Sequence, residues 1–262
     1  MTDSPNSLAE AQRLIETGEL SMVFGVLGEL ADEVYEAAML AGIAANRLGD
    51  LTAAAARFQR AMEIDPEKPE AVLNLGLTFR AMEDNAQAES AFRRAIELSP
   101  ESVPANFALG NLLLQRGAYT EATELFERVA KVSPHHVGAL NNLGICYSRL
   151  GQMDESAKQF EAIIAADPEN TGALANLGAI RSEQGRSDEA IDLLNRALDL
   201  VPGQVEASNN LGVALMDKGR YGKAVALLQP LANGDGAGAE TFSNLGNALA
   251  KLGDTAGAAA AY

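Results

Sequence analysis

Hydrophobic and small residues recur along most of the chain at the spacing of amphipathic helices. Residues three, four and seven apart share one face of a helix, and the segments 69–82 and 85–98 both follow this spacing. The apolar face consists of Val72, Leu75, Gly76 and Phe79 in the first segment and of Ala88, Ala91, Phe92 and Ala95 in the second. We therefore predict two helices joined by a short polar turn.

The same two-helix pattern repeats every 34 residues. One column of prolines keeps this interval at Pro66, Pro100, Pro134, Pro168 and Pro202. One column of glycines keeps it at Gly42, Gly76, Gly110, Gly144, Gly178, Gly212 and Gly246. Two columns in register over this length indicate a stack of identical helix pairs rather than one globular core.

The glycine column falls inside the predicted first helix of each repeat, where glycine costs about 1 kcal/mol relative to alanine. We attribute its recurrence to the close approach of the second helix. The complementary side chains would be Ala54 and Phe58, Ala88 and Phe92, and Ala122 and Phe126. A phosphate-binding loop would need its glycines clustered at a strand-to-helix turn, which this dispersed column excludes.

A helix-breaking residue separates the two helices of each repeat. In most repeats it is a glycine able to take the left-handed conformation, at Gly49, Gly117, Gly151, Gly185, Gly219 and Gly253. The second repeat has Glu83, Asp84 and Asn85 instead. There we expect Asn85 to be left-handed, because asparagine tolerates this conformation better than most residues.

The succession of Leu-Gly, Ala, Phe, Ala and Pro within 34 residues resembles the tetratricopeptide repeat. The resemblance implies an all-α fold in which antiparallel helix pairs stack into a right-handed superhelical solenoid with a concave groove. Six repeats are expected over residues 35–238 and a truncated seventh over 239–262. Residues 1–34, with helices expected over 7–16 and 20–31, fit the frame loosely and are predicted to form a degenerate N-terminal capping helix pair.

Two places depart from the repeat. Pro230 falls within the second helix of the sixth repeat, where it favours either a shortened helix with a longer loop or a hinge. In the seventh repeat the second helix stops at Tyr262, so we expect the natural chain to continue. Leu245 and Leu249 would then lie at an uncapped edge that frays or associates end to end with another copy.

Asparagine recurs in the predicted first helices, which line the groove in the family that the chain resembles. Asparagine is a middling helix former, so propensity does not explain the column. It stands two residues before the glycine at Asn74, Asn142, Asn176, Asn210 and Asn244, with Asn141 and Asn209 one residue earlier and Asn111 and Asn247 after the glycines of their repeats. The column resembles the asparagine ladder in the repeat domain of O-linked N-acetylglucosamine transferase, which implies binding of an extended polypeptide. The alternative is that these amides pack against neighbouring helices or contact water.

A carboxylate clamp for a chain terminus, known in the same family, would need lysine and arginine on successive first helices. Groove positions here carry Leu73, Phe107 and Ala175 instead, which disfavours the clamp. Catalytic, metal and cofactor sites are not expected either. His135 and His136 are the only histidines and are interpreted as solvated loop residues. The acidic pairs at Asp154 and Asp188 suit the positive ends of second helices.

Charge and composition narrow the choice of partner. The chain has 36 acidic and 20 basic side chains and a formal net charge of −16, which repels nucleic acid and anionic membranes. The N-terminus does not resemble a signal peptide, and the longest apolar stretch, 22–30, is too short to span a bilayer. A single cysteine, Cys146, is interpreted as a small buried hydrophobe. A cytoplasmic location is therefore predicted.

The sequence thus favours a protein–protein interaction scaffold that binds an extended polypeptide segment in its groove and is not itself an enzyme. The alternative is a substrate-recruiting arm of a larger enzyme, such as a glycosyltransferase, sulfotransferase or methyltransferase, whose catalytic domain would lie beyond residue 262.

Overall fold

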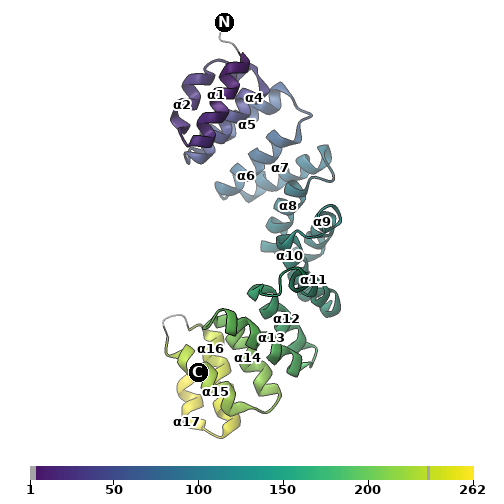
Figure 1. Ribbon diagram of the computed structural model, residues 1–262, viewed down its shortest axis with the longest axis vertical. Coiled ribbons are helices and arrows are strands. Elements are labelled where there is room, and N and C mark those ends of the chain that lie inside the picture. Colours follow the sequence, from purple (N-terminus) through teal and green to yellow (C-terminus); the bar gives the residue numbers. More distant parts are fainter. Residues whose placement is uncertain (1–3, 235–236) are drawn as a thin grey trace. The chain divides into compact units, whose positions relative to one another are not determined.

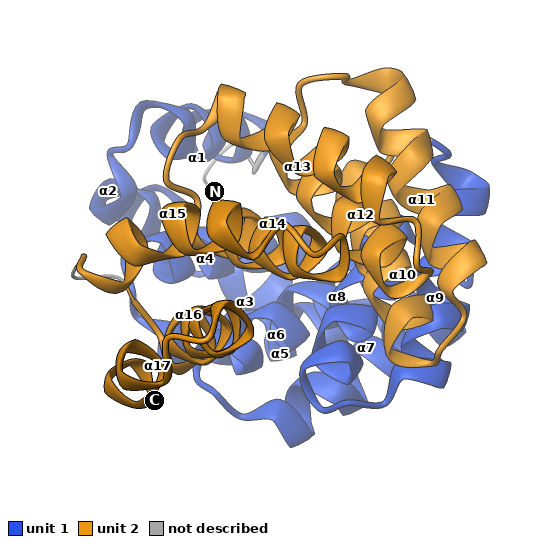
Figure 2. Ribbon diagram, turned by 90° about the horizontal axis from the view of Figure 1, so that it is seen from below, with its two compact units in different colours: residues 1–134 blue, residues 135–262 orange. Residues whose placement is uncertain are grey.

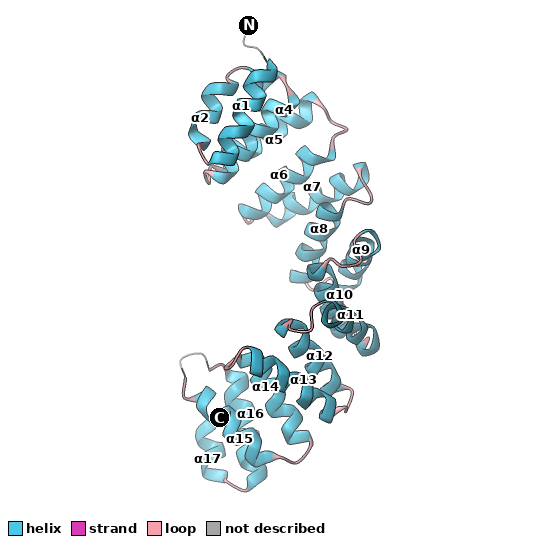
Figure 3. Ribbon diagram, viewed as in Figure 1, coloured by secondary structure: helices cyan, strands magenta, loops and turns pink. Residues whose placement is uncertain are grey.

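The chain folds into paired helices. The computed structural model describes residues 4–234 and 237–262, and every regular element within these ranges is a helix (Figure 3). The helices divide into two compact units, an N-terminal unit over Met1–Pro134 and a C-terminal unit over His135–Tyr262 (Figure 2).

The N-terminal unit contains the predicted capping segment and three helix pairs (Figure 1). Its elements are α1 (Ser4–Thr17), α2 (Leu20–Leu27), α3 (Leu30–Glu33), α4 (Tyr35–Arg47), α5 (Leu51–Ile64), α6 (Pro69–Ala81), α7 (Asn85–Leu98), α8 (Val103–Gln115) and α9 (Tyr119–Val132). The predicted helices at 69–82 and 85–98 are confirmed to within one residue as α6 and α7.

The C-terminal unit continues the pairing with the same period. Its elements are α10 (Val137–Arg149), α11 (Met153–Ala166), α12 (Thr171–Glu183), α13 (Ser187–Leu200), α14 (Val205–Asp217), α15 (Tyr221–Ala232), α16 (Ala239–Leu252) and α17 (Thr255–Ala261). We call α4, α6, α8, α10, α12, α14 and α16 the first helices, because each opens a pair.

The glycine column lies where the two helices of each pair touch. A Cβ atom built on Gly42 would come within 2.6 Å of the Phe58 ring, and one on Gly144 would come within 2.7 Å of the Phe160 ring. Gly178 meets Leu194 instead, at 2.6 Å. Any side chain at these positions would overlap a buried one, which confirms close approach as the reason for the column.

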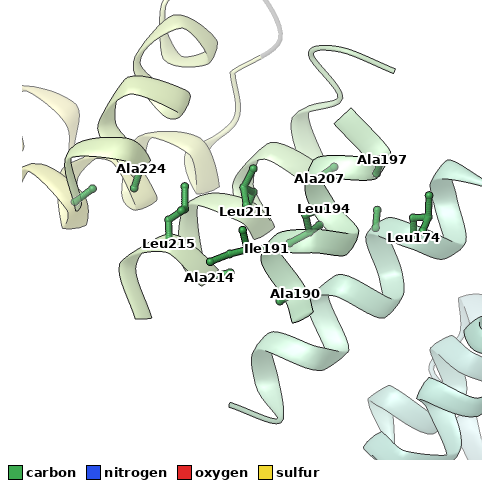
Figure 4. Packing of buried hydrophobic residues seen from close by; sticks show 12 residues of the cluster. Leu174, Ala190, Ile191, Leu194, Ala197, Ala207, Leu211, Ala214, Leu215 and Ala224 are labelled. Atoms are coloured by element: carbon green, nitrogen blue, oxygen red, sulfur yellow. The ribbon is translucent and has the colours of Figure 1, made fainter. Parts of the chain in front are cut away.

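Small residues let the neighbouring pairs pack closely as well. In the C-terminal unit, the cluster drawn in Figure 4 includes Ala190 and Leu194 from α13 and Ala207 and Leu211 from α14. All four are less than 5% exposed. In this cluster alanines thus pack against larger aliphatic side chains.

The turns inside the pairs follow the prediction with one exception. All six predicted turn glycines have positive φ, from 69° at Gly219 to 85° at Gly253. In the second repeat, Glu83 is the left-handed residue, with φ 62°, and the expectation for Asn85 was wrong. Asn85 instead begins α7, because Asp84 takes the N-cap position and its side chain accepts a hydrogen bond from the Gln87 amide.

The N-terminal segment is helical, but its second helix is broken. The expected helix over 20–31 is split into α2 and α3 at Gly28, which has φ 48°. Buried side chains of α1 to α3, such as Leu14, Val23 and Leu27, pack with Ala37 and Ala41 of α4. The segment therefore covers the first regular helix pair.

Helix α15 continues past Pro230 to Ala232, so the proline lies inside the helix. With 12 residues, α15 is shorter than the second helices α5, α7, α9, α11 and α13, which have 14, and more residues separate it from the next helix, as the shortened-helix alternative predicts. One other sequence interpretation needs correction. His136 is not a solvated loop residue, because its Nδ1 accepts a hydrogen bond from the Ala139 amide and so caps α10. The acidic pairs at Asp154 and Asp188 do open α11 and α13 as predicted, and Cys146 is buried.

The last helix pair is closed by Tyr262. Its ring would lie 2.8 Å from a Cβ atom on Gly246, the place that Phe58 and Phe160 take in their own pairs. The Tyr262 hydroxyl donates a hydrogen bond of 2.6 Å to Asn247 Oδ1. Leu245 is only 2% exposed, so the expectation that it lies at an open edge was wrong.

Candidate functional site

Three asparagines of the C-terminal unit form a linked cluster on two first helices. Asn141 and Asn142 lie on α10 and Asn176 lies on α12. Asn176 Nδ2 donates to Asn141 Oδ1 at 3.2 Å, and Asn141 Nδ2 donates to Asn142 Oδ1 at 3.3 Å. All three side chains are partly exposed, so amide groups stand side by side on an accessible surface.

Asn210 extends this surface to α14. It stands in the same column position as Asn142 and Asn176 and is also partly exposed. We call Asn141, Asn142, Asn176 and Asn210 the asparagine cluster. Amides that offer both donors and acceptors match the alternating N–H and C=O groups of an extended peptide backbone.

The neighbouring Asn209 has a different role. It is only 3% exposed, and its Nδ2 donates to Thr241 Oγ1 at 3.1 Å, which links α14 to α16. In the N-terminal unit, Asn46 at a different repeat position makes a bond of the same kind, from Nδ2 to Thr78 Oγ1 at 3.1 Å. Both are therefore packing residues that tie one first helix to the next, although Asn209 was a predicted binding residue.

The other predicted residues are dispersed. Asn74 Nδ2 donates to the Glu70 carbonyl of its own helix, and Asn111 on α8 is partly exposed in the same unit. Asn244 on α16 has a buried Nδ2 without a hydrogen-bond partner among the described residues. Asn247 is exposed and accepts the hydrogen bond from Tyr262.

The contact between Asn141 and Asn176 was not predicted. The two residues are 35 residues apart and belong to adjacent columns, whereas the sequence columns join residues exactly one repeat apart. A spacing of one repeat plus one residue was the signal that could have found this pair.

Charged groups around α12 are already paired. Arg181 is 7% exposed and contacts Glu161, while its Nε lies 3.5 Å from Glu189. In the N-terminal unit, Arg47 donates to the Ile15 carbonyl at 2.9 Å. Both arginines therefore tie neighbouring helices together.

Within 4–234 and 237–262, no three His, Cys, Asp or Glu side chains are grouped so that they could hold a metal ion. In the same ranges, no helix has the length and apolar content that crossing a membrane requires.

Sequence models of a known family match most of the chain. Two models described as tetratricopeptide repeat match, one over residues 113–180 and the other over 24–69, 73–131 and 175–239. The chain belongs to the tetratricopeptide repeat family. The tetratricopeptide frame accounts for the helix pairs, for the glycine column and for the all-α fold. No curated protein sequence matches it significantly.

Solved tetratricopeptide repeat structures are similar to this chain in fold. A protein from Parabacteroides merdae has a TM-score of 0.70 at 17% identity, over 87% of this chain and 90% of that one. YrrB, described as having an unusual peptide-binding site, has a TM-score of 0.60 at 20% identity, over 78% and 96%. MamA has a TM-score of 0.58 at 23% identity, over 61% and 93%. At these identities the likeness concerns the fold alone.

Proposed function

We propose that the chain is a protein-interaction scaffold whose asparagine cluster binds an extended segment of a partner polypeptide. The observation that carries the proposal is the linked row of Asn141, Asn142 and Asn176, which are partly exposed on adjacent first helices. The peptide-binding site described for YrrB supports the same use of this fold.

The energetics point to modest affinity. Each hydrogen bond between an amide side chain and a peptide backbone contributes about 1 kcal/mol net. Four such bonds would contribute about 4 kcal/mol, which corresponds to a Kd on the order of millimolar, and ordering a flexible segment opposes part of that gain, so tighter binding needs further contacts. Such affinity suits a scaffold that exchanges partners. It equally suits the substrate-recruiting arm of a larger enzyme. No described residue distinguishes a scaffold from such an arm.

Changing Asn142, Asn176 and Asn210 together to alanine is expected to weaken partner binding at least tenfold, or by at least about 1.4 kcal/mol. The three side chains are partly exposed, so helicity and the melting temperature should change little. The partner is recovered by affinity capture and mass spectrometry, and its affinity is then measured by calorimetry with the purified partner.

The matched control is Asn195→Ala, which removes an exposed asparagine from the second helix α13. It should leave the affinity unchanged. Equal affinities for the triple variant, the control and the unmodified protein would rule out the asparagine cluster as the binding surface.

A further inference from the structure

An apolar groove lies on the first helices of the N-terminal unit. It has a volume of about 570 Å³ and lies between α1, α4 and the start of α6. Its apolar lining includes Leu8, Tyr35, Met39 and Leu40. Leu8 and Leu40 belong to the cluster formed by the N-terminal segment, whereas Tyr35 and Met39 belong to the next cluster. The groove thus opens where two core clusters meet.

The repeat positions that line this groove carry apolar side chains, whereas some of the matching positions in the C-terminal unit carry asparagine. Leu40 stands two residues before Gly42, in the column that carries asparagine at Asn142 and Asn176. The adjacent column shows the same contrast. It reads Met39, Leu73 and Phe107 in the N-terminal unit, but Asn141, Ala175 and Asn209 in the C-terminal unit.

The apolar column continues beyond the groove. Met39, Leu73 and Phe107 are all partly exposed on successive first helices, α4, α6 and α8. Apolar side chains grouped on an accessible surface mark interaction sites more often than single ones do. Three successive first helices of the N-terminal unit therefore present a partly exposed apolar side chain at this position.

The rim of the groove has one lysine, which is paired with acidic side chains of the protein, so its unpaired charge is negative. Its lysine, Lys68, lies 3.2 Å from Glu36 Oε1 and 3.7 Å from Asp65 Oδ2, and its Nζ is 4.1 Å from the centre of the Tyr35 ring. The hydrogen bond to Glu36 raises the pKa of Lys68, so it stays charged and paired. Glu70, also on the rim, is exposed and forms no ion pair with a described residue.

Burial and the negative charge of Glu70 also affect Tyr35, whose ring lines the groove. Burial first, and then the Glu70 carboxylate, raise the pKa of Tyr35 to about 12. The tyrosine therefore stays neutral at physiological pH and adds no charge. The apolar lining of the groove and the unpaired Glu70 carboxylate together complement a segment that combines large apolar and basic side chains.

We propose that this groove binds a cationic amphipathic segment of a partner polypeptide. The segment would place its large apolar side chains against Leu8, Met39 and Leu40 and its basic side chains beside Glu70. The inference rests on the proposed function, since it assigns a second contact and a sequence character to the partner of the scaffold. The formal net charge of −16 favours the same class of partner over long range.

The test uses three short fluorescent peptides and the full chain. The first peptide is an amphipathic helix of leucine and lysine, the second has serine in place of leucine, and the third has glutamate in place of lysine. Fluorescence anisotropy should give a micromolar Kd for the first and values at least about tenfold weaker for the other two. Comparable binding of the glutamate or the serine peptide, or no binding of the first, would overturn the proposal.

Leu40→Asn locates the contact, because asparagine already occupies this column in five other repeats and fits the helix there. We expect the leucine–lysine peptide to bind this variant about tenfold more weakly. Met39→Asn, whose column contains Asn141 and Asn209, serves as a second variant if Leu40→Asn does not fold by circular dichroism. Unchanged peptide affinity in the folded variant would refute the assignment.

Glu70→Gln tests the charge at constant shape. It should weaken the leucine–lysine peptide several-fold and reduce the salt dependence of its binding, because screening acts on the charge pair. Glu101→Gln removes the same charge from an exposed loop position and should change neither quantity. Equal effects of the two variants would show that only net charge matters and would overturn the site.

The two proposals fail separately. The asparagine triple variant should bind the leucine–lysine peptide as the unmodified protein does. If that variant loses the natural partner while Leu40→Asn keeps both partner and peptide, the proposed function stands and the groove assignment falls. If Leu40→Asn loses the peptide while the triple variant keeps the natural partner, the groove assignment stands and the asparagine cluster falls.

Discussion

Replacing Gly144 with leucine is expected to destabilise the α10–α11 pair by about 3 kcal/mol and to make it the first part of the chain to unfold. A Cβ atom at Gly144 would lie 2.7 Å from the Phe160 ring, and Phe160 is only 1% exposed. The helices are also joined at this level, since Ser156 Oγ donates to the Gly144 carbonyl at 2.7 Å.

Hydrogen exchange followed by mass spectrometry measures this loss repeat by repeat. Protection should fall in α10 and α11 and remain in α16. The matched control is Gly222→Leu, because a Cβ atom on Gly222 in α15 has nothing within 4 Å. That variant should be neutral or slightly stabilising, since leucine is the better helix former.

A compensating change distinguishes overpacking from other causes. Phe160→Ala in the Gly144→Leu background removes the ring that the leucine overlaps, so the double variant should be more stable than the sum of the single changes implies. Additive losses, or protection that falls equally in all repeats, would contradict close approach as the role of the glycine column.

The fold was predictable where one residue type has a single physical use. Glycine at a position such as Gly144 signals contact between helices, and Gly219 signals a left-handed turn, because few other residues fit either place. The prediction failed where the conformation of a residue depends on its neighbours. Either Glu83 or Asn85 could take the left-handed conformation of this turn. The capping bond of Asp84 places the helix start at Asn85, so Glu83 is the left-handed residue.

The candidate site was less predictable, because exposure and partners depend on how helices stack. Asn176 and Asn209 look alike in the repeat pattern, yet one is partly exposed and the other is buried against Thr241. The N-terminal groove was missed for another reason. Met39 and Leu40 read as ordinary apolar helix residues, and only the stacking of α1 against α4 shows that they remain accessible.

Replacing Phe126 with alanine is expected to have an even larger effect, a loss of about 3–5 kcal/mol from the free energy of unfolding of its helix pair. Phe126 is fully buried, and its ring fills the space above Gly110. It also meets the Phe107 ring edge-on, with centroids 5.8 Å apart and an interplanar angle of 63°. Alanine would leave a cavity that the α8–α9 pair can close only by moving its helices together.

The chain supplies its own control for this substitution. Leu194 stands opposite Gly178 at the equivalent position, so leucine is compatible with a column glycine. Phe126→Leu should therefore cost only about 1 kcal/mol, most of it from the lost contact with Phe107. Urea titration gives the total loss, and hydrogen exchange should place it in α8 and α9 because stability in a repeat array is a sum of local contributions. If leucine costs as much as alanine, the space above Gly110 requires an aromatic ring, and the equivalence of the repeats fails at this position.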